Sequence, residues 1–248
     1  MAFKFTVSPD FSPERLAGWY VFNTYLQRKL QIAIHLEIYP DFTSQREAIK
    51  ADKVDLIYAN PYDASMLIRE KGFFSLARPE GKSDEAVIAV AADRGIGRVE
   101  DLTPGISVAT TADPDVHMMG MIMLEPANLN SDNVNLQVCE SYVLVAKQLL
   151  KGRCDVGIFL AEAFHDLSAL VKNRLRVLVS SEIQVIHHSL MLGPALSRYR
   201  EPLCEVLLAM PEDEKGRSVL SLLGFPAWVA VDGETTEFMI DLMDTLLV

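Results

Sequence analysis

The sequence lacks the features that mark several large classes of protein. Its longest apolar stretches, such as Val87–Ala92 and Val185–Gly193, are far shorter than a membrane-spanning helix requires. Basic residues are in the minority, because 23 Lys and Arg stand against 34 Asp and Glu, which gives a net charge of −11. A negative field of this kind repels phosphate backbones and anionic lipid surfaces. We therefore expect no membrane insertion and no nucleic-acid partner.

Cysteines and catalytic motifs are also scarce. The three cysteines, Cys139, Cys154 and Cys204, are odd in number and widely spaced, which predicts buried thiols and no disulfide framework. This thiol pattern slightly favours a reducing compartment. The chain has no Gly-x-Ser-x-Gly, His-Glu-x-x-His, Walker or Cys-x-x-Cys motif. We therefore predict no covalent chemistry, no cofactor and no metal.

The N-terminal residues alternate in the manner of a strand and contain no basic region followed by a long apolar stretch. Two locations remain open on this evidence. The protein is cytoplasmic if the chain is native from Met1, and periplasmic if a signal peptide was removed and replaced by a start Met.

Short β-type runs alternate with helical stretches along most of the 248 residues, a pattern typical of an α/β sheet with helices on its faces. The predicted strands are 3–8, 34–39, 54–59, 86–92, 106–109, 133–139, 155–159, 175–179 and 186–192. The chain beyond Ser197 is predicted to form helices only. Capping residues predict helix starts at Ser12, Ser44, Asn60, Asp113 and Ser141.

The ends of the predicted strands are the first places to look for a binding site, because ligands of open α/β sheets lie beyond the carboxyl ends of strands. These positions are 8–10, 40–43 and 60–62. His187 and His188 are adjacent on one predicted strand and point to opposite faces, which argues against a shared metal. His117 differs, because the first turn of its helix allows it to face a ligand at the helix N-terminus.

The order of these segments resembles that of the phosphate, phosphite and phosphonate substrate-binding proteins of ABC importers, which have the type II periplasmic-binding-protein fold. The resemblance covers nearly the whole chain. The supporting stretches are FTVSP (5–9), VDLIYANPY (54–62), VEDLTPGISVA (99–109), LLKGRCDVG (149–157) and GRSVLSLLGF (216–225). It implies an α/β protein of two lobes, with a ligand cleft between the lobes and two hinge crossovers.

The resemblance also implies where the chain passes between the lobes. The crossovers would fall near Val87–Ala92 and Ile186–Leu192. Lobe one would hold residues 1–88 and 190–248, with both termini, and lobe two would hold residues 89–189. Ala89 and Leu190 are then expected to lie side by side.

Several departures from the family pattern imply a changed ligand. The family holds its ligand oxygens with a hydroxyl-rich loop at a helix N-terminus. The corresponding segment here, Thr110–Pro114, keeps two hydroxyls but adds Asp113 and a proline. As an N-cap, Asp113 is expected to occupy the helix donors itself and to add a negative charge. The resemblance therefore predicts a ligand other than phosphonate.

The other departures concern aromatic and polar positions. Phe42 stands where the family has a cleft tyrosine, Asp84 lies near its second tyrosine, and Ser141 and Tyr142 stand at its Ser-His helix start. Each such residue also suits a structural role as a cap or core filler. The predicted ligand-binding residues are Ser8, Phe42, Asn60, Tyr62, Asp84, Thr110, Thr111, Asp113, His117, Ser141, Tyr142 and Phe159.

The resulting functional prediction is a solute-binding protein of a phosphate/phosphonate-type ABC transporter family, which binds a small molecule in the cleft and catalyses no reaction. Its partners are a small-molecule ligand and either an ABC transporter permease or a sensor protein. The alternatives are a cytoplasmic enzyme and a ligand-sensing regulatory subunit on the same scaffold. The fold does not decide among them.

Overall fold

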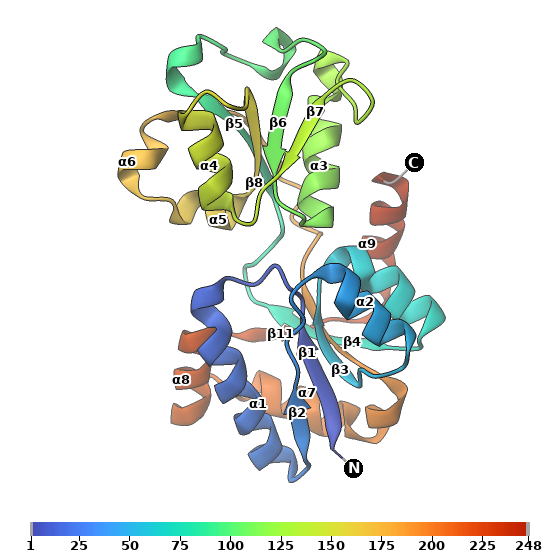
Figure 1. Cartoon of the computed structure of the whole chain (residues 1–248). Coiled ribbons are helices and arrows are strands. Elements are labelled where there is room, and N and C mark those ends of the chain that lie inside the picture. Colours follow the sequence, from blue (N-terminus) through green and yellow to red (C-terminus); the bar gives the residue numbers. More distant parts are fainter. Residues whose placement is uncertain (1, 247–248) are drawn as a thin grey trace. The chain divides into compact units, whose positions relative to one another are not determined.

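The computed structural model describes residues 2–246, and these residues form two compact units (Figure 1). Of the described residues, the first unit contains 2–82 and His187–Met243. The second unit contains Ser83–Ile186 and residues 244–246. The chain therefore leaves the first unit, builds the second, and returns.

The first unit is built on a sheet of six strands in the order β11-β4-β10-β3-β1-β2. β1 is parallel to β2 and β3, whereas β10 is antiparallel to β3 and β4, and β11 is antiparallel to β4. The bounds of these strands are β1 Phe3–Val7, β2 Ile34–Leu36, β3 Leu56–Ala59, β4 Phe74–Pro79, β10 Ser189–Leu192 and β11 Trp228–Ala230.

One face of this sheet carries the core of the first unit. Buried side chains of β1, β3 and β10 pack there against α1 (Leu16–Leu30), α7 (Arg200–Leu208) and α8 (Glu214–Leu223). α1 supplies Trp19 and Phe22 to this core, and the Phe5 ring meets both rings edge to face. Burial of such aromatic side chains is the main stabilising contribution of a core.

The opposite face of the sheet is covered by α2 (Phe42–Lys50). The buried Gln45 amide of α2 donates to the Thr6 hydroxyl at 3.1 Å and to the Val7 carbonyl at 2.8 Å, which fixes α2 against β1. The remaining helices of the unit are η1 Pro13–Arg15, η2 Pro61–Asp63, the π-helix η3 Met66–Glu70, η7 Pro194–Tyr199 and α9 Gly233–Leu246.

The second unit has a five-stranded sheet in the order β7-β6-β8-β5-β9. β6 is parallel to β7 and β8, and β5 is antiparallel to β8 and β9. The strands are β5 Ala86–Ala91, β6 Ser107–Thr110, β7 Asn135–Val138, β8 Val156–Leu160 and β9 Leu175–Ser180.

Helices cover both faces of this second sheet. α4 and α5 pack on one face through Val145, Ala146 and Phe164. α3 lies on the other face, where a Cβ at Gly120 would come within 2.4 Å of the Ile158 side chain. The helices are η4 Ala92–Arg94, η5 Val99–Asp101, α3 Pro114–Leu124, η6 Glu125–Ala127, α4 Tyr142–Leu150, α5 Ala161–Asp166 and α6 Ala169–Lys172.

The sequence did not reveal two strands. β4 was not predicted, and β11 falls in the region expected to be helical. β11 has three residues and pairs with β4 alone, which leaves too short a segment for a period-2 pattern to be visible.

The predicted capping box at Ser44 is wrong. The N-cap of α2 is Asp41, whose carboxylate accepts from the Ser44 backbone N–H at 2.7 Å. The predicted caps at Asn60 and Ser141 are confirmed, because each side chain accepts from a backbone N–H in the following turn.

The predicted first crossover also differs from the structure. β5 lies wholly in the sheet of the second unit, so a boundary at residue 88 would cut through a strand. Ala89 pairs with Gly157 and Val177, whereas Leu190 pairs with Tyr58 and Ala77, so these two residues belong to different sheets. The expectation that they lie side by side is therefore wrong. The connecting segments meet earlier, where the Asp84 N–H donates to the Ile186 carbonyl at 2.8 Å.

Candidate functional site

In the first unit, the carboxyl ends of three neighbouring parallel strands lie at one edge of the sheet. We call the residues at these carboxyl-terminal strand ends the first edge. Its residues follow β1, β2 and β3, and they are Ser8, Asp10, Phe42, Arg46, Asn60, Tyr62 and Asp63, joined by His188 just before β10.

Asp10 is the centre of a hydrogen-bonded group at the first edge. Its carboxylate accepts from the Asn60 amide at 2.6 Å and contacts His188 Nε2 at 3.0 Å. The Tyr58 ring stacks on the His188 imidazole with centroids 5.2 Å apart. Burial raises the pKa of Asp10, but the His188 charge and hydrogen bonds from His188, Asn60 and Ser8 outweigh burial and lower that pKa. Asp10 is therefore ionised at neutral pH.

Arg46 forms a second group at the first edge. Its guanidinium lies over the Phe42 ring at 5.2 Å and over the Tyr62 ring at 4.9 Å. Its Nε lies 2.6 Å from Oδ1 of the buried Asp63. Phe42 and Tyr62 were predicted as ligand-binding residues, whereas Arg46, which lies over both rings, was not.

In the second unit, the ends of the parallel strands β6 and β7 carry a comparable set of polar residues. We call this the second edge. Thr110 ends β6, Thr111 follows it, and Ser141 caps α4 directly before Tyr142. Asp113 is the N-cap residue of α3, and Pro114 is its first residue.

The role of Asp113 differs from the prediction. Its side chain makes no capping hydrogen bond to α3 and instead accepts from the Tyr142 hydroxyl at 3.0 Å. Burial, followed by the charge of Asp113, raises the pKa of Tyr142 well above its ordinary value. Tyr142 therefore remains a neutral donor. The expectation that Asp113 occupies the helix donors is wrong, whereas the additional carboxyl group does lie at the start of α3.

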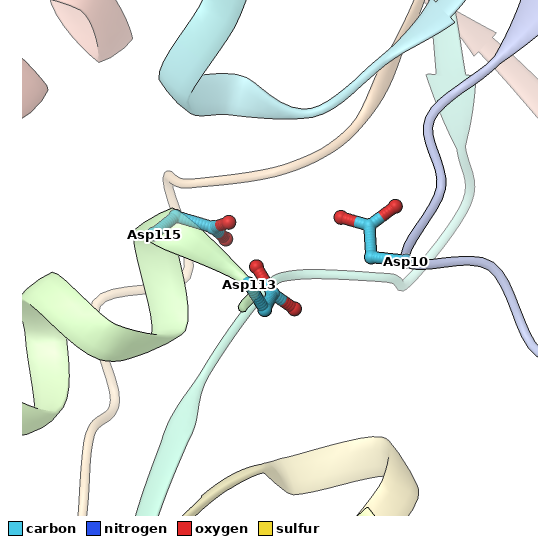
Figure 2. A group of neighbouring side chains, drawn as sticks. All are labelled: Asp10, Asp113 and Asp115. Carbon is cyan, nitrogen blue, oxygen red and sulfur yellow. The ribbon is translucent and has the colours of Figure 1, made fainter. Parts of the chain in front are cut away.

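A second carboxylate accompanies Asp113 at the second edge. Asp113 and Asp115 both lie at the start of α3, and Figure 2 also shows Asp10 in the segment after β1. Both residues of α3 are buried. Asp115 is not among the predicted ligand-binding residues.

His117 lies in the first turn of α3, as predicted, and its backbone N–H donates to the Asp113 carbonyl at 3.0 Å. Its Nδ1 is buried and makes no hydrogen bond to any residue between 2 and 246. Burial lowers the pKa of the imidazole. His117 is therefore neutral at physiological pH.

Two predicted site residues lie away from these edges. Phe159 is fully buried in the core of the second unit, where its ring meets Phe164 edge to face, so it offers no wall to a ligand. Asp84 lies in the segment that connects the two units. The structure groups Ser8, Phe42, Asn60 and Tyr62 at the first edge.

The two adjacent histidines have different surroundings. His187 is buried, and its Nδ1 lies 3.1 Å from the Ser189 hydroxyl. This serine–histidine contact was not anticipated, but both residues are at most 3% exposed, which leaves a substrate no access. His187 and His188 lie just before β10 and not on a strand as predicted, and His188 contacts Asp10 at the first edge. The strand-end position of residue 10 was the only sequence signal for that pair.

The folds of solved proteins define the class of this protein. PhnD1 of Prochlorococcus marinus, in complex with methylphosphonate, superposes with a TM-score of 0.83 at 11% identity, over 99% of this chain and 98% of that chain. A Xanthomonas citri protein bound to chloride superposes with a TM-score of 0.81 at 16% identity, over 99% of this chain and 97% of that chain. The aliphatic sulphonate binding protein SsuA of Escherichia coli superposes with a TM-score of 0.69 at 16% identity, over 100% of this chain and 88% of that chain. The chain thus has the type II periplasmic-binding-protein fold.

Sequence similarity then gives the family. The profile of the ABC-transporter phosphonate periplasmic substrate-binding proteins matches residues 5–236, so the chain belongs to that family. No curated protein sequence matches the chain. Members of the family are transporter components that bind small molecules for an ABC permease in the periplasm. Within residues 2–246, no helix is both long and apolar enough to span a bilayer.

Proposed function

We propose that this protein is a solute-binding protein that binds a small molecule, works in the periplasm, delivers its ligand to an ABC permease, and catalyses no reaction. Members of the family bind solutes, and each unit has polar and aromatic side chains at the carboxyl ends of its parallel strands. We further propose that the ligand is not a phosphonate or phosphate dianion.

The pair of carboxylates at the start of α3 carries the proposal about the ligand. A helix N-terminus attracts anions through its N–H groups and its dipole. Asp113 and Asp115 place negative charge at that position in this chain. Two like charges about 4 Å apart repel by about 4 kcal/mol at an effective dielectric constant of about 20. That repulsion offsets roughly half of a micromolar binding free energy.

Calorimetric titration tests this proposal. Methylphosphonate, phosphite and phosphate are titrated into the native protein, Asp113→Ser and the control Asp166→Ser, which changes an exposed acid of the same unit. We expect weak or absent binding by the native protein and the control, and measurable binding by Asp113→Ser. Tight binding by the native protein that the Asp113 substitution leaves unchanged would contradict the proposed exclusion.

A ligand screen tests the solute-binding function itself. The native protein is heated in the presence of phosphonates, organic acids, amines and neutral metabolites. A ligand at a hundred times its dissociation constant stabilises the folded state by about 2.7 kcal/mol, a clear rise in melting temperature. Unchanged melting with every class would favour the regulatory-subunit alternative.

A further inference from the structure

We propose that Arg46 is a ligand-binding residue of the first edge and that it selects a singly charged organic acid, a carboxylate or a sulfonate, over a dianion. This inference depends on the proposed solute-binding function, because it names the chemistry of the ligand at one edge. The proposed solute-binding function does not depend on the inference about Arg46.

The position of Arg46 is the first reason. The residue extends from the middle of α2 toward the segment after β3, where Tyr62 and Asp63 lie. The side chain of Arg46 is 27% exposed, so the group is neither core nor free surface. Residues at the carboxyl ends of parallel strands are the ones that contact ligands in this class of sheet.

The rigidity of the guanidinium is the second reason. The guanidinium lies over the Phe42 ring and over the Tyr62 ring, at 5.2 Å and 4.9 Å from their centroids. A planar guanidinium stacks on aromatic faces and presents its N–H groups in a fixed fork. Because these contacts already order the side chain, binding of a ligand acceptor to this fork loses little conformational entropy.

An unused donor is the third reason. Nε of Arg46 donates to Asp63, whereas Nη2 is buried and has no hydrogen-bond partner among residues 2–246. A buried donor without an acceptor destabilises a structure, and a charged donor does so more strongly. A ligand oxygen that accepts from this group would remove the penalty, which makes binding at Arg46 favourable.

Local charge favours a single negative charge on the ligand. Asp63 already compensates the positive charge of Arg46 at 2.6 Å, and the ionised Asp10 adds a further carboxylate to the first edge. A charge-assisted hydrogen bond from such a compensated cation suits a carboxylate or sulfonate oxygen. A second negative charge on the ligand would add to the repulsion from the Asp63 and Asp10 carboxylates.

A matched ligand series tests the inference. Butanoate and butanamide carry a propyl group, and butanesulfonate, butylphosphonate and butylamine carry a butyl group, so the series differs mainly in the head group. Each is titrated calorimetrically into the native protein, Arg46→Gln, Arg46→Lys and the control Arg69→Gln. Arg69 lies in the same unit and pairs with the exposed Glu237 and Asp241. Melting curves without ligand check that each variant folds.

We expect the native protein to bind butanoate or butanesulfonate more tightly than butylphosphonate. Arg46→Gln should weaken binding of the acid by about tenfold to a hundredfold, since it removes a hydrogen bond from a charged donor. Arg46→Lys keeps the positive charge but loses the fork, so it should also weaken binding and still fold. Arg69→Gln should bind as the native protein does.

Different outcomes separate the inference from the proposed function. Equal binding of the acid by native and Arg46 variants overturns the role of Arg46, and tighter binding of butylphosphonate, butanamide or butylamine than of both acids overturns the selectivity. Both results leave a solute-binding protein. Failure of the whole series overturns the inference, while the broader thermal screen decides the function.

Discussion

Nε2 of His188 lies 3.0 Å from Oδ2 of Asp10, which joins the segment that returns from the second unit to the segment that leaves β1. Both side chains are largely buried, at 12% and 6% exposed. Asn60 donates to the same carboxylate oxygen, so residues from three separate parts of the chain meet at Asp10. We expect this group to stabilise the first unit as well as to shape its edge.

Replacement of Asp10 by Asn tests that stabilising role. Interactions with His188, Asn60 and Ser8 lower the folded-state pKa of Asp10 despite its burial. A lowered carboxyl pKa stabilises the folded state above the unfolded-state pKa, about 3.9, and this contribution is lost as pH falls through the folded-state value. Asp10→Asn should therefore reduce the unfolding free energy by about 1–3 kcal/mol at pH 7. The deficit should shrink in acid, as measured by urea denaturation.

A matched acid substitution provides the control. Asp166→Asn changes an exposed carboxylate and should alter the unfolding free energy by less than about 0.5 kcal/mol. A deficit in Asp10→Asn that is the same at pH 3 and pH 7 would contradict the linkage to ionisation.

His187 should make the protein less stable in mild acid. Burial, together with the positive charge of Arg78, lowers its pKa from 6.5 to about 4. Between these values the unfolded chain binds a proton that the folded protein does not bind. The contribution to stability is therefore complete above about pH 6.5 and decreases as pH falls toward 4, by up to about 3 kcal/mol.

Urea denaturation between pH 4 and 7 measures this slope. His187→Ala should flatten the slope in that interval, whereas His165→Ala, at an exposed position, should leave it as in the native protein. An unchanged slope in His187→Ala would show that other groups cause the acid sensitivity.

Tyr62 and Tyr142 should contribute to ligand affinity from the two edges. Tyr62 stacks on Arg46, and Tyr142 donates to Asp113, so each ring is held at a strand-end position. Replacement of either by Ala should weaken binding of the solute found in the screen by about tenfold to a hundredfold, or about 1–3 kcal/mol. Calorimetry on His187→Ala, whose buried side chain leaves a ligand no access, should show native affinity. Equal losses at all three positions would contradict the assignment of the edges.

Gly18 should be essential to the packing of α1 against α8. A Cβ at this position would lie 2.7 Å from the Leu222 carbonyl oxygen, a contact with backbone that a side-chain rotation cannot relieve. Gly18→Ala should lower the melting temperature although alanine favours a helix by about 1 kcal/mol. Gly233→Ala, at the start of α9 with no atom within 4 Å of the added Cβ, is the control and should melt as the native protein does or slightly higher.

Local signals in the sequence were sufficient for most of the fold. Alternation and apolar runs predicted nine of the strands, since β-type side chains on a half-buried surface leave a period that is visible in a single chain. Asn60 and Ser141 were predicted as caps because a cap depends on neighbouring backbone groups only. The site residues at strand ends followed from the general position of ligands in α/β sheets.

Contacts between distant segments required the tertiary structure. The acceptor role of Asp113 toward Tyr142 joins residues 29 positions apart, and the contact of His188 with Asp10 joins residues 178 apart. Arg46 illustrates the same limit, because nothing near an arginine in a helix indicates that an aromatic ring and a buried carboxylate from the segment after β3 will contact it. The sequence by itself determined the elements, the caps and the family resemblance. Only the tertiary structure decided which charges meet, because electrostatic partners depend on distance in space and not on separation along the chain.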